Sequence, residues 1–405
     1  MEDTTLFQQA LGILPPWHVT ECSFSADSQR LDIWIDFKRG SVFACPSCGV
    51  AGCKAYDTDK LEWRHLNFFQ HQAYLHARTP RVECSQCGVK RVTVPWARAD
   101  SNFTLLFEAF VMTLVKAMPV LPAARLVGEH DTLIWRIVHY YIDTARAAED
   151  HSKVSRVGID ETAARRGHDY VTAIVDMDER KVLFATPGKD AATVKAFAGD
   201  LKVHGGDAEK INEVSIDMSK AFISGVKDNL PNASVTFDKF HVVATVNDGV
   251  DKVRRQEQKE IPALKSTRYV WLKNPENLTG SQVDTLIELD ITKSNLKTAK
   301  AYRIKLAFQE LYNQPKEEAE GYLRRWYFWA THSHIQPIID AAKTIKAHWD
   351  GVLRWFDSQI NNGILEGINS LIQAAKHKAR GYRSNRNFIA IIYLIAGKLP
   401  MRLPT

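Results

Sequence analysis

Two closely spaced cysteine pairs carry the clearest chemical signal in this sequence. Cys45 and Cys48 are separated by two residues, as are Cys84 and Cys87, and a glycine follows each pair. In such a knuckle the backbone amides turn toward the thiolates, and the glycine relieves the strain of that turn. Four thiolates complete the coordination of a tetrahedral Zn²⁺, so the spacing predicts a structural zinc site. A redox pair or a coincidence of spacing is the alternative.

The segment around these pairs is expected to be rich in strands. The alternation of residues 30–37 predicts a strand, and residues 72–77 and 91–95 are strand-like. The 35 residues between the two pairs exceed a compact zinc ribbon, which predicts one or two hairpins between them. Spare ligand candidates are Cys53, His65, His71 and His76. Cys22 has no partner in sequence and is expected to be a small buried side chain.

Two aspartates follow apolar segments typical of buried strands. Strands are expected at residues 154–160, 170–176, 181–186, 213–217 and 233–237, with helices at 190–203 and 219–230. Three strands followed by alternating helices and strands is the order of a ribonuclease-H-like fold, in which the first strand is central and the fourth lies beside it. Asp160 and Asp217 then meet near adjacent strand ends, where a divalent cation relieves the repulsion between their carboxylates.

A third acid, Glu366, is expected on a helix that packs against this sheet. One stripe of that helix is apolar: Ile364, Leu365, Ile368, Leu371 and Ile372. The opposite stripe is polar: Asn362, Glu366, Asn369, Ser370 and Gln373. A solvated face normally mixes several charges, so one acid among amides favours a face turned toward a metal and phosphates. A solvated glutamate is the alternative.

Residues 121–141 have the pattern of a helix-turn-helix. Residues 121–127 and 131–141 predict two helices, with a turn at 128–130 and Asp131 as N-cap. The second helix should expose Thr132, Trp135, Arg136 and His139 and pack Leu133, Ile134, Ile137 and Val138. With Arg125 of the first helix, Thr132, Trp135 and Arg136 are the candidate DNA contacts. A generic helical hairpin is the alternative.

Composition and charge limit the class of protein. With 45% hydrophobic and 25% charged residues, the chain is neither disordered nor fibrous. The longest apolar run, residues 388–397, is too short to span a bilayer, and the acidic start does not resemble a signal peptide, so a cytoplasmic protein without membrane contact is expected. After Glu366 the chain has no acid and a net charge of +7, and residues 251–305 carry a net +5. A polyanionic partner is the simplest explanation of such stretches, and solvated helix faces that happen to be basic are the alternative.

These motifs together resemble the DDE transposases of the ISL-three family of bacterial insertion sequences. The resemblance covers roughly residues 40–400, with its motifs in the family's order. They comprise the cysteine knuckles, the helix-turn-helix, Gly158-Ile-Asp160-Glu161, Ser215-Ile-Asp217-Met218, Phe237-Asp238-Lys-Phe-His241, Asn361-Asn-Gly-Ile-Leu-Glu366-Gly-Ile-Asn369, Lys376 and Gly381-Tyr382-Arg383.

The resemblance implies an α/β protein with a ribonuclease-H-like core and a large all-helical insertion, preceded by zinc-binding and helix-turn-helix domains. The expected domains are 1–98 (zinc), 99–150 (helix-turn-helix), 151–254 and 351–405 (core), and 255–350 (insertion). Asp160, Asp217 and Glu366 would bind two Mg²⁺ (or Mn²⁺) ions that promote cleavage at the terminal inverted repeats and strand transfer into target DNA.

Supporting roles follow for residues around this triad. Asp238, His241, Asn362 and Asn369 would support catalysis, and Lys376, Lys378, Arg380, Arg383 and Arg386 would hold DNA phosphates. Tryptophans in or beside the insertion either form its core or stack on unpaired bases. Joining two double-stranded DNA ends implies a homodimer or higher oligomer, associated with the nucleoid when bound to DNA. A DNA-binding regulator with an inert core, a structure-selective nuclease of the same fold and, more weakly, a zinc-bearing RNA-binding enzyme are the alternatives.

Overall fold

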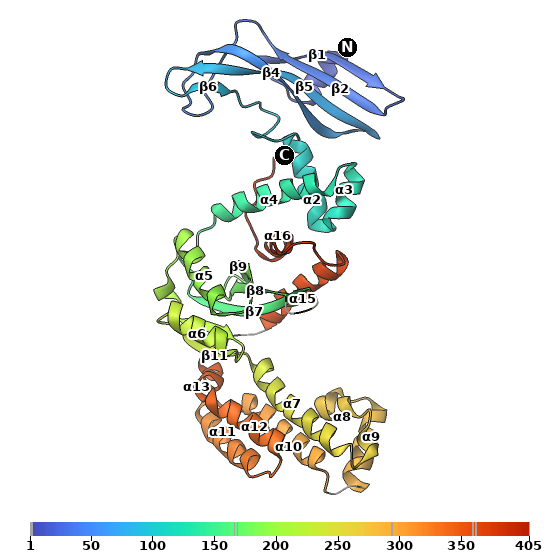
Figure 1. Ribbon diagram of the computed structural model, residues 1–405, viewed down its shortest axis with the longest axis vertical. Helices are drawn as coiled ribbons and strands as arrows, with labels where there is room; N and C mark the ends of the chain where they lie inside the picture. The colour runs from blue at the N-terminus through green and yellow to red at the C-terminus, as the bar shows by residue number, and fades with distance from the viewer. Residues whose placement is uncertain are drawn as a thin grey trace. The chain divides into compact units, whose positions relative to one another are not determined.

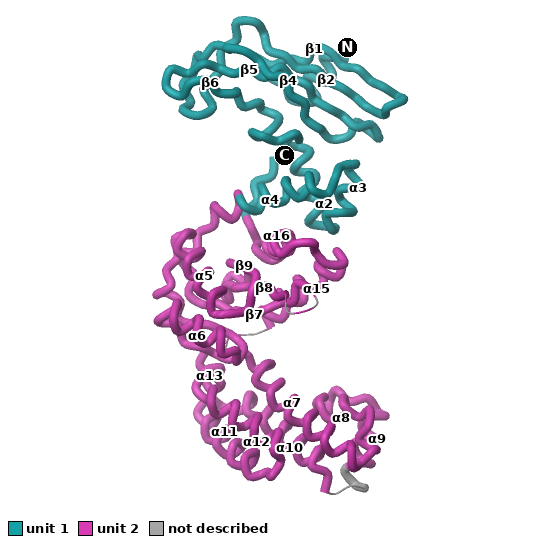
Figure 2. The backbone as a smooth tube through the Cα atoms, viewed as in Figure 1, with its two compact units in different colours: residues 1–143, 400–405 teal, residues 144–399 magenta. Residues whose placement is uncertain are grey.

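The computed structural model divides the chain into two compact units (Figure 2). The first comprises residues 1–143 and 400–405, and the second comprises residues 144–399. The structure describes the chain except for residues 1–2, 166, 168, 293–294, 359, 361–362 and 405 and the side chains of residues 290–292. A search of the described helices finds none that is long and apolar enough to cross a membrane.

A twisted sheet around a long hairpin forms most of the first unit (Figure 1). Its strands follow the order β1-β2-β5-β4-β3, and β6 pairs with β5. Their bounds are β1 Trp17–Ser25, β2 Arg30–Phe37, β3 Val42–Phe43, β4 Cys53–Phe68, β5 His71–Cys84 and β6 Gly88–Arg91. The predicted strand at 30–37 is confirmed as β2, and the expected excursion between the cysteine pairs is the hairpin of β4 and β5.

The strand expected at residues 91–95 is wrong, because β6 ends at Arg91. The apolar alternation has another cause: Val92, Val94 and Trp96 are buried in the core of the sheet while the backbone leaves the ladder. Packing without strand pairing produced the same period-two pattern.

Helices complete the first unit. They are α1 Asp3–Ala10, α2 Leu105–Ala117, α3 Val120–Val127 and α4 Asp131–Ala147, whose last turn lies in the second unit. The predicted helix pair is confirmed in α3 and α4, and Gly128 ends α3 in the left-handed conformation (φ 74°). Asp131 is not the N-cap: it is already helical, and the His130 imidazole accepts a hydrogen bond from the Thr132 amide (3.3 Å).

The sheet of the second unit has the order β11-β10-β7-β8-β9. Its strands are β7 Arg156–Arg165, β8 Asp169–Asp176, β9 Lys181–Pro187, β10 Glu213–Ile216 and β11 Ser234–Phe237. β7 is central and β10, the fourth strand, lies beside it, as predicted. The expected end of β7 is wrong: antiparallel pairing with β8 extends β7 to Arg165, which leaves Asp160 in the middle of the strand.

Helices pack on both faces of this sheet. On one face, Val157 and Ile159 of β7 share a core with α5 (Ala191–Val203) and α6 (Lys220–Asn229). On the other face α15 (Gly363–Lys378) lies against β7 and α16 (Asn385–Ala396) against β9 (Figure 1). A methyl group on Gly158 would approach Leu365 Cδ2 of α15 to 2.7 Å, so the absence of a side chain there permits the close packing of α15.

The chain between β11 and α15 is helical. Its helices are α7 Lys239–Glu257, α8 Arg268–Leu272, α9 Gly280–Thr292, α10 Lys297–Gln309, α11 Lys316–Thr331, α12 Gln336–Ala347, α13 Trp349–Leu353 and α14 Trp355–Ser358. Trp271 and Trp326 are almost fully buried here and belong to the core, the first of the two expectations for the tryptophans.

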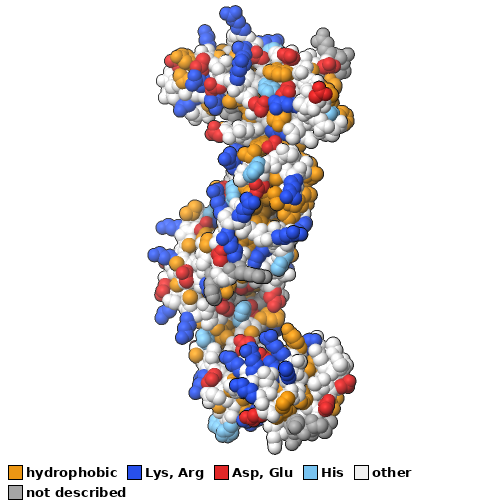
Figure 3. Space-filling view, turned by 45° about the vertical axis from the view of Figure 1, so that its right-hand side comes forward, with side chains coloured by type: hydrophobic (Ala, Val, Ile, Leu, Met, Phe, Trp, Pro, Cys, Tyr) orange, Lys and Arg blue, Asp and Glu red, His pale blue; other side chains and the backbone are white. Residues whose placement is uncertain are grey.

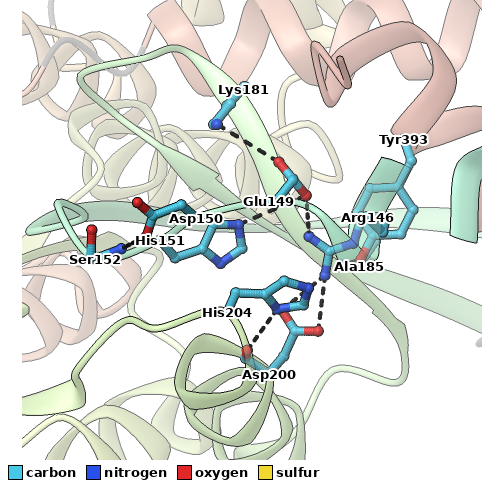
Figure 4. A network of polar contacts seen from close by, with 10 residues as sticks. All are labelled: Arg146, Glu149, Asp150, His151, Ser152, Lys181, Ala185, Asp200, His204 and Tyr393. Carbon is cyan, nitrogen blue, oxygen red and sulfur yellow. Dashed lines mark hydrogen bonds and ion pairs between the residues drawn. The ribbon is translucent and has the colours of Figure 1, made fainter. Parts of the chain in front are cut away.

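A buried network of charged side chains joins the last turn of α4 to α5 and α16 (Figure 4). Arg146 donates two hydrogen bonds of 2.9 Å to the Asp200 carboxylate and forms a second ion pair with Glu149. The Tyr393 ring lies 4.6 Å from the Arg146 guanidinium, and its hydroxyl accepts a hydrogen bond from the Ala185 amide of β9. These partners compensate the burial of the Arg146 charge.

A second buried ion pair, within the first unit, holds α2 against α4. The Glu108 carboxylate is fully buried on α2 and accepts hydrogen bonds from Arg98 Nε (2.9 Å), Ser101 Oγ (2.6 Å) and Tyr141 Oη of α4 (3.1 Å). The helix-turn-helix therefore rests on a carboxylate whose charge one arginine compensates.

Replacing Arg98 with Met leaves Glu108 buried without its cation, a loss that typically costs about 3–5 kcal/mol. We expect the free energy of opening of the α2 amides at pH 7 to fall by that amount, measured by hydrogen exchange on the full chain. Arg91→Met is the control, because the Arg91–Asp59 pair (2.7 Å) is partly exposed and is worth about 1 kcal/mol at most. An equal effect of the two substitutions would contradict the buried-charge argument.

Candidate functional site

Three aspartates lie in one row across the parallel strands of the second unit. In the register of β10 with β7, Ser215 pairs with Gly158, so Asp217 is level with Asp160 two residues further on. In the register of β10 with β11, Ile216 pairs with Phe237, which places Asp217 level with Asp238. Neighbouring strands are about 4.8 Å apart, so the row gathers three acids at one sheet edge.

Backbone amides orient these carboxylates. Asp160 accepts a hydrogen bond from the Glu161 amide (2.8 Å), and Asp217 accepts one from the Ser219 amide (2.9 Å). Asp238 caps α7 by accepting from the Phe240 amide (2.7 Å). Asp217 and Asp238 are thereby held directly after the ends of β10 and β11, whereas Asp160 is held within β7.

The electrostatics of the row centre on Asp160. Burial raises the pKa of Asp160, and the charge of Asp238 adds to that rise, whereas the Glu161 amide, the His241 charge and the Asn369 side chain oppose it. Burial also raises the pKa of Glu161, with smaller contributions from Asp217 and Asp160. A nearby cation would favour the ionised forms of Asp160 and Glu161, which burial disfavours.

Helix α15, which carries Glu366, packs against the strand that carries Asp160. Leu365 packs over Gly158, and Asn369, one turn after Glu366, donates a hydrogen bond from Nδ2 to Asp160 Oδ2 (3.1 Å). The Glu366 side chain is exposed. The polar stripe of α15 follows β7 further along the strand. Gln373 Nε2 donates a hydrogen bond to Thr162 Oγ1, and Lys376 Nζ donates one to the Ala163 carbonyl.

The two predicted stripes of α15 need one correction. Leu365 and Ile372 are buried, but Leu371, expected in the packed stripe, is 46% exposed. Both stripes of α15 contact β7: Leu365 from the apolar stripe, and Asn369 and Gln373 from the polar stripe. The helix is therefore rotated relative to the prediction, which leaves Leu371 exposed. Asn362, predicted to support catalysis, lies outside the described residues.

The chemistry of these residues fits a hard divalent cation. Asp160, Asp217 and Glu366 offer carboxylate oxygens, the ligands that Mg²⁺ and Mn²⁺ prefer. Asn369 Oδ1 is buried without a hydrogen-bond partner and lies on the residue that contacts Asp160. Among the described residues, however, the three acids do not form a cluster with all ligand atoms within 4.8 Å.

Basic side chains surround the carboxyl end of α15. Lys378, Arg380, Arg383 and Arg386 are exposed on the last turn of α15, the connection to α16 and its first turn. Arg165 of β7 donates a hydrogen bond to the Arg383 carbonyl and so ties this connection to the acid-bearing strand. In Figure 3, further Lys and Arg side chains gather on one face of the helical part around α7–α13.

The helix-turn-helix exposes part of the predicted contact set. Arg125, Thr132 and Arg136 are exposed, whereas Trp135 and His139 are half-buried and stack on each other with centroids 5.7 Å apart. Ile134, Ile137 and Val138 are fully buried, as expected. Leu133, also expected to pack, is half-buried.

The four predicted zinc cysteines converge. Their Sγ atoms all lie within 4.8 Å of one another, and Cys48 Sγ and Cys84 Sγ are 3.6 Å apart. A tetrahedron with Zn–S bonds of 2.3 Å has edges of about 3.8 Å, so the cluster fits Zn²⁺. The amides of Cys48 and Ser47 lower the pKa of the Cys45 thiol to about 6, and those of Gln86 and Cys87 lower the pKa of Cys84. Each knuckle thus stabilises one thiolate, whereas the pKa values of Cys48 and Cys87 are raised, and the knuckle glycines, Gly49 and Gly88, adopt positive φ.

The spare ligand candidates do not join this cluster. Burial lowers the pKa of His65 to about 4, and its Nδ1 contacts Thr104 Oγ1 (2.9 Å). His76 pairs with Asp32 (2.6 Å), and His71 packs edge-on against Phe24. Cys53 is buried near Val50, and Cys22 is half-buried rather than buried.

The cysteine cluster, the helix pair and the row of aspartates together define a modular protein that acts on DNA. Comparison with known proteins agrees. Three protein-family models match the chain. Residues 41–87 match the zinc-finger of transposase IS204/IS1001/IS1096/IS1165, and residues 92–142 match the helix-turn-helix domain of transposase family ISL3. Residues 157–392 match a transposase model of ISL3 type.

Whole-length relatives agree with these matches. The transposase for insertion sequence element IS1557 of Mycobacterium tuberculosis is 29% identical, with 99% of this chain and 97% of the relative covered. The transposase for insertion sequence element IS1001 of Bordetella parapertussis is 30% identical, with 94% and 95% covered. The chain belongs to the ISL3 family of insertion-sequence transposases.

Replacing Cys84 with Ser removes one of the two thiolates that the knuckle amides stabilise. We expect the purified full chain to lose its stoichiometric Zn²⁺, measured by elemental analysis, and the Cys45–Cys48 knuckle to lose hydrogen-exchange protection. Cys53→Ser is the matched control, since Cys53 is buried nearby but lies outside the cluster. Zinc loss in Cys53→Ser alone would reverse the ligand assignment.

Proposed function

We propose that this transposase cleaves DNA at the terminal inverted repeats of its element and joins the freed ends to target DNA, with Asp160, Asp217 and Glu366 as its metal-binding triad. The observation that carries the proposal is the docking of α15 on β7. The Asn369–Asp160 hydrogen bond places the helix of Glu366 directly over the strand whose aspartate is level with Asp217.

The proposed core is ribonuclease-H-like. The order β11-β10-β7-β8-β9, with β7–β9 antiparallel and β10 and β11 parallel to β7, supports this assignment. We propose that residues 151–254 and 351–405 form the core, 255–350 a helical insertion, 1–98 the zinc domain and 99–150 the helix-turn-helix domain. The helices α8–α12 between the two core segments support the insertion.

The proposed cofactors are two Mg²⁺ or Mn²⁺ ions, and the proposed role of Zn²⁺ is structural. Bound at the triad, divalent cations would activate the attacking water or DNA 3′-hydroxyl and stabilise the leaving oxygen in an in-line phosphoryl transfer. Asn369 would orient Asp160 through its Nδ2 and offer its unpartnered Oδ1 to the site. Asp238 and His241 would tune the charge at Asp160, on which both act electrostatically.

The surrounding basic residues would position DNA. Lys376, Lys378, Arg380, Arg383 and Arg386 follow Glu366 along the chain and would neutralise phosphates next to the reacting one. Arg125, Thr132, Trp135 and Arg136 of the helix-turn-helix would read the terminal repeats, and two DNA ends would be joined within a homodimer or higher oligomer.

Glu366→Ala should abolish chemistry without abolishing DNA binding. On a labelled duplex carrying the element's own end, with Mg²⁺, we expect nicking and joining to fall by more than about 100-fold, because a loss of 10–100-fold is typical even of an outer-shell partner. Glu318→Ala, on the exposed start of α11, is the control and should cut normally. A Glu366→Ala protein that cuts as fast as wild type would refute the triad.

Asn369→Ala tests the positioning of Asp160. Losing this hydrogen bond should raise the Mg²⁺ concentration needed for half-maximal cleavage by about 10- to 100-fold, with recovery at high Mg²⁺. A merely structural role would instead lower the rate equally at all Mg²⁺ concentrations. Ser370→Ala, exposed one residue further on, should behave as wild type.

A further inference from the structure

A cavity of about 550 Å³ opens beside Glu366, and Glu366 is the one lining residue to which the proposed mechanism assigns a role. Its walls come from the start of α7, the segment before α11, α14 and the start of α15. The lining residues are Lys239, Phe240, Tyr312, Gln314, Lys316, Trp355, Phe356, Ile360, Gly363 and Glu366. Its volume lies within the range of about 300–1,000 Å³ typical of small-ligand sites.

Aromatic rings form much of the cavity wall. Tyr312 and Trp355 meet at near right angles with centroids 5.1 Å apart, and the Phe356 ring lies parallel to Tyr312 at 6.3 Å. Phe240 is 49% exposed at the same cavity. Trp355 is half-buried, in contrast to Trp271 and Trp326 in the helical core. These rings therefore keep surface available for stacking.

Cations lie among these rings. Lys239 Nζ is 5.4 Å from the Trp355 ring centroid and 5.6 Å from that of Tyr312. Lys316 also lines the cavity and forms an exposed ion pair with Asp357 (2.5 Å). Because exposed ion pairs are weak, a phosphate can compete for Lys316 at little cost.

One polar atom of the wall lacks a partner. The Tyr312 hydroxyl is buried and has no hydrogen-bond partner among the residues that the structure describes. Burial, with a smaller contribution from the charge of Asp238, raises the pKa of Tyr312, so the group stays a neutral O–H donor. A buried donor without an acceptor is costly, which indicates a ligand that carries an acceptor.

Stacking faces, cations and an unused donor together match an unpaired nucleobase and its phosphate. Bases stack on aromatic rings whatever their sequence, lysines neutralise the phosphate, and base edges carry acceptors for a hydroxyl. We propose that this cavity receives one unpaired base of the DNA strand whose phosphate lies at Glu366, with Trp355 as its stacking platform. A base reaches such a site only after it has left the duplex, so the cavity would hold the DNA end open during cleavage.

The assignment rests on the proposed triad, because Glu366 lines the same cavity and fixes which base is nearest. The test is nevertheless independent of cleavage. The probe is a single-stranded oligothymidylate with one 2-aminopurine, whose fluorescence is quenched when its base stacks on an aromatic ring. The same probe annealed to its complement reports whether pairing prevents this stacking.

Wild type should quench the single-stranded probe, and Trp355→Ala should abolish the quenching and weaken binding by at least about fivefold. Trp329→Ala is the matched control, since Trp329 is 40% exposed on α11 outside the cavity and should change neither reading. Tyr312→Phe keeps the ring and removes only the hydroxyl, so it should keep the quenching and weaken binding less. Zinc content and circular dichroism equal to wild type establish that each variant is folded.

Failure of the cavity and failure of the triad give different results. If Trp355→Ala quenches and binds like wild type, the base site is refuted even where Glu366→Ala has lost cleavage. If Glu366→Ala cuts normally while Trp355→Ala alone loses quenching, the triad is refuted and the base site stands. Equal losses in Trp329→Ala and Trp355→Ala would assign the stacking to another surface.

Discussion

Mutual repulsion of carboxylates held on adjacent parallel strands is the constraint on which the second unit depends. The pairing of β10 with β7 and β11 sets Asp160, Asp217 and Asp238 in one row, so the strand register fixes the positions of their backbones. Burial at Asp160 sharpens the conflict, since desolvation disfavours its ionised form. A sheet that needed only stability would place apolar residues there. Perturbed carboxylates of this kind are typical of functional sites, and the proposed divalent cation would relieve the unfavourable charge at Asp160.

The docking of α15 brings the helix of a further acid, Glu366, against the strand that carries Asp160. The helix approaches β7 closely because Gly158 has no side chain to hold Leu365 away, and Asn369 then reaches Asp160. The same contact sets the start of α15 beside the aromatic cavity. Acid, amide and cavity therefore follow from one helix–strand contact between segments about two hundred residues apart in the chain.

In the first unit, the long hairpin of β4 and β5 has a tight turn at one end and needs a cross-link between the strands at the other. The cysteine knuckles lie there, where β5 ends and β4 begins, and their amides favour the thiolates that Zn²⁺ requires. At the helix-turn-helix, Glu108 and Arg98 form a buried pair that fixes α2 against α4. Both devices use a few polar groups to rigidify elements that would otherwise be joined by apolar contacts alone.

The sequence by itself determined the elements and their chemistry. Alternation predicted β2, apolar segments predicted β8 and β9, and the spacing of the cysteines predicted their cluster, because each of these patterns is local in the chain. The order of strands and helices along the chain predicted that β7 is central. Only the tertiary structure decided that β7 continues past Asp160, that Leu371 turns outward, and that Trp355 lines a cavity while Trp326 is core. The buried Arg146–Asp200 and Arg98–Glu108 pairs had no signal in the sequence either. These features depend on which distant surfaces meet, and the residues of one segment do not encode the shape of the surface against which it packs.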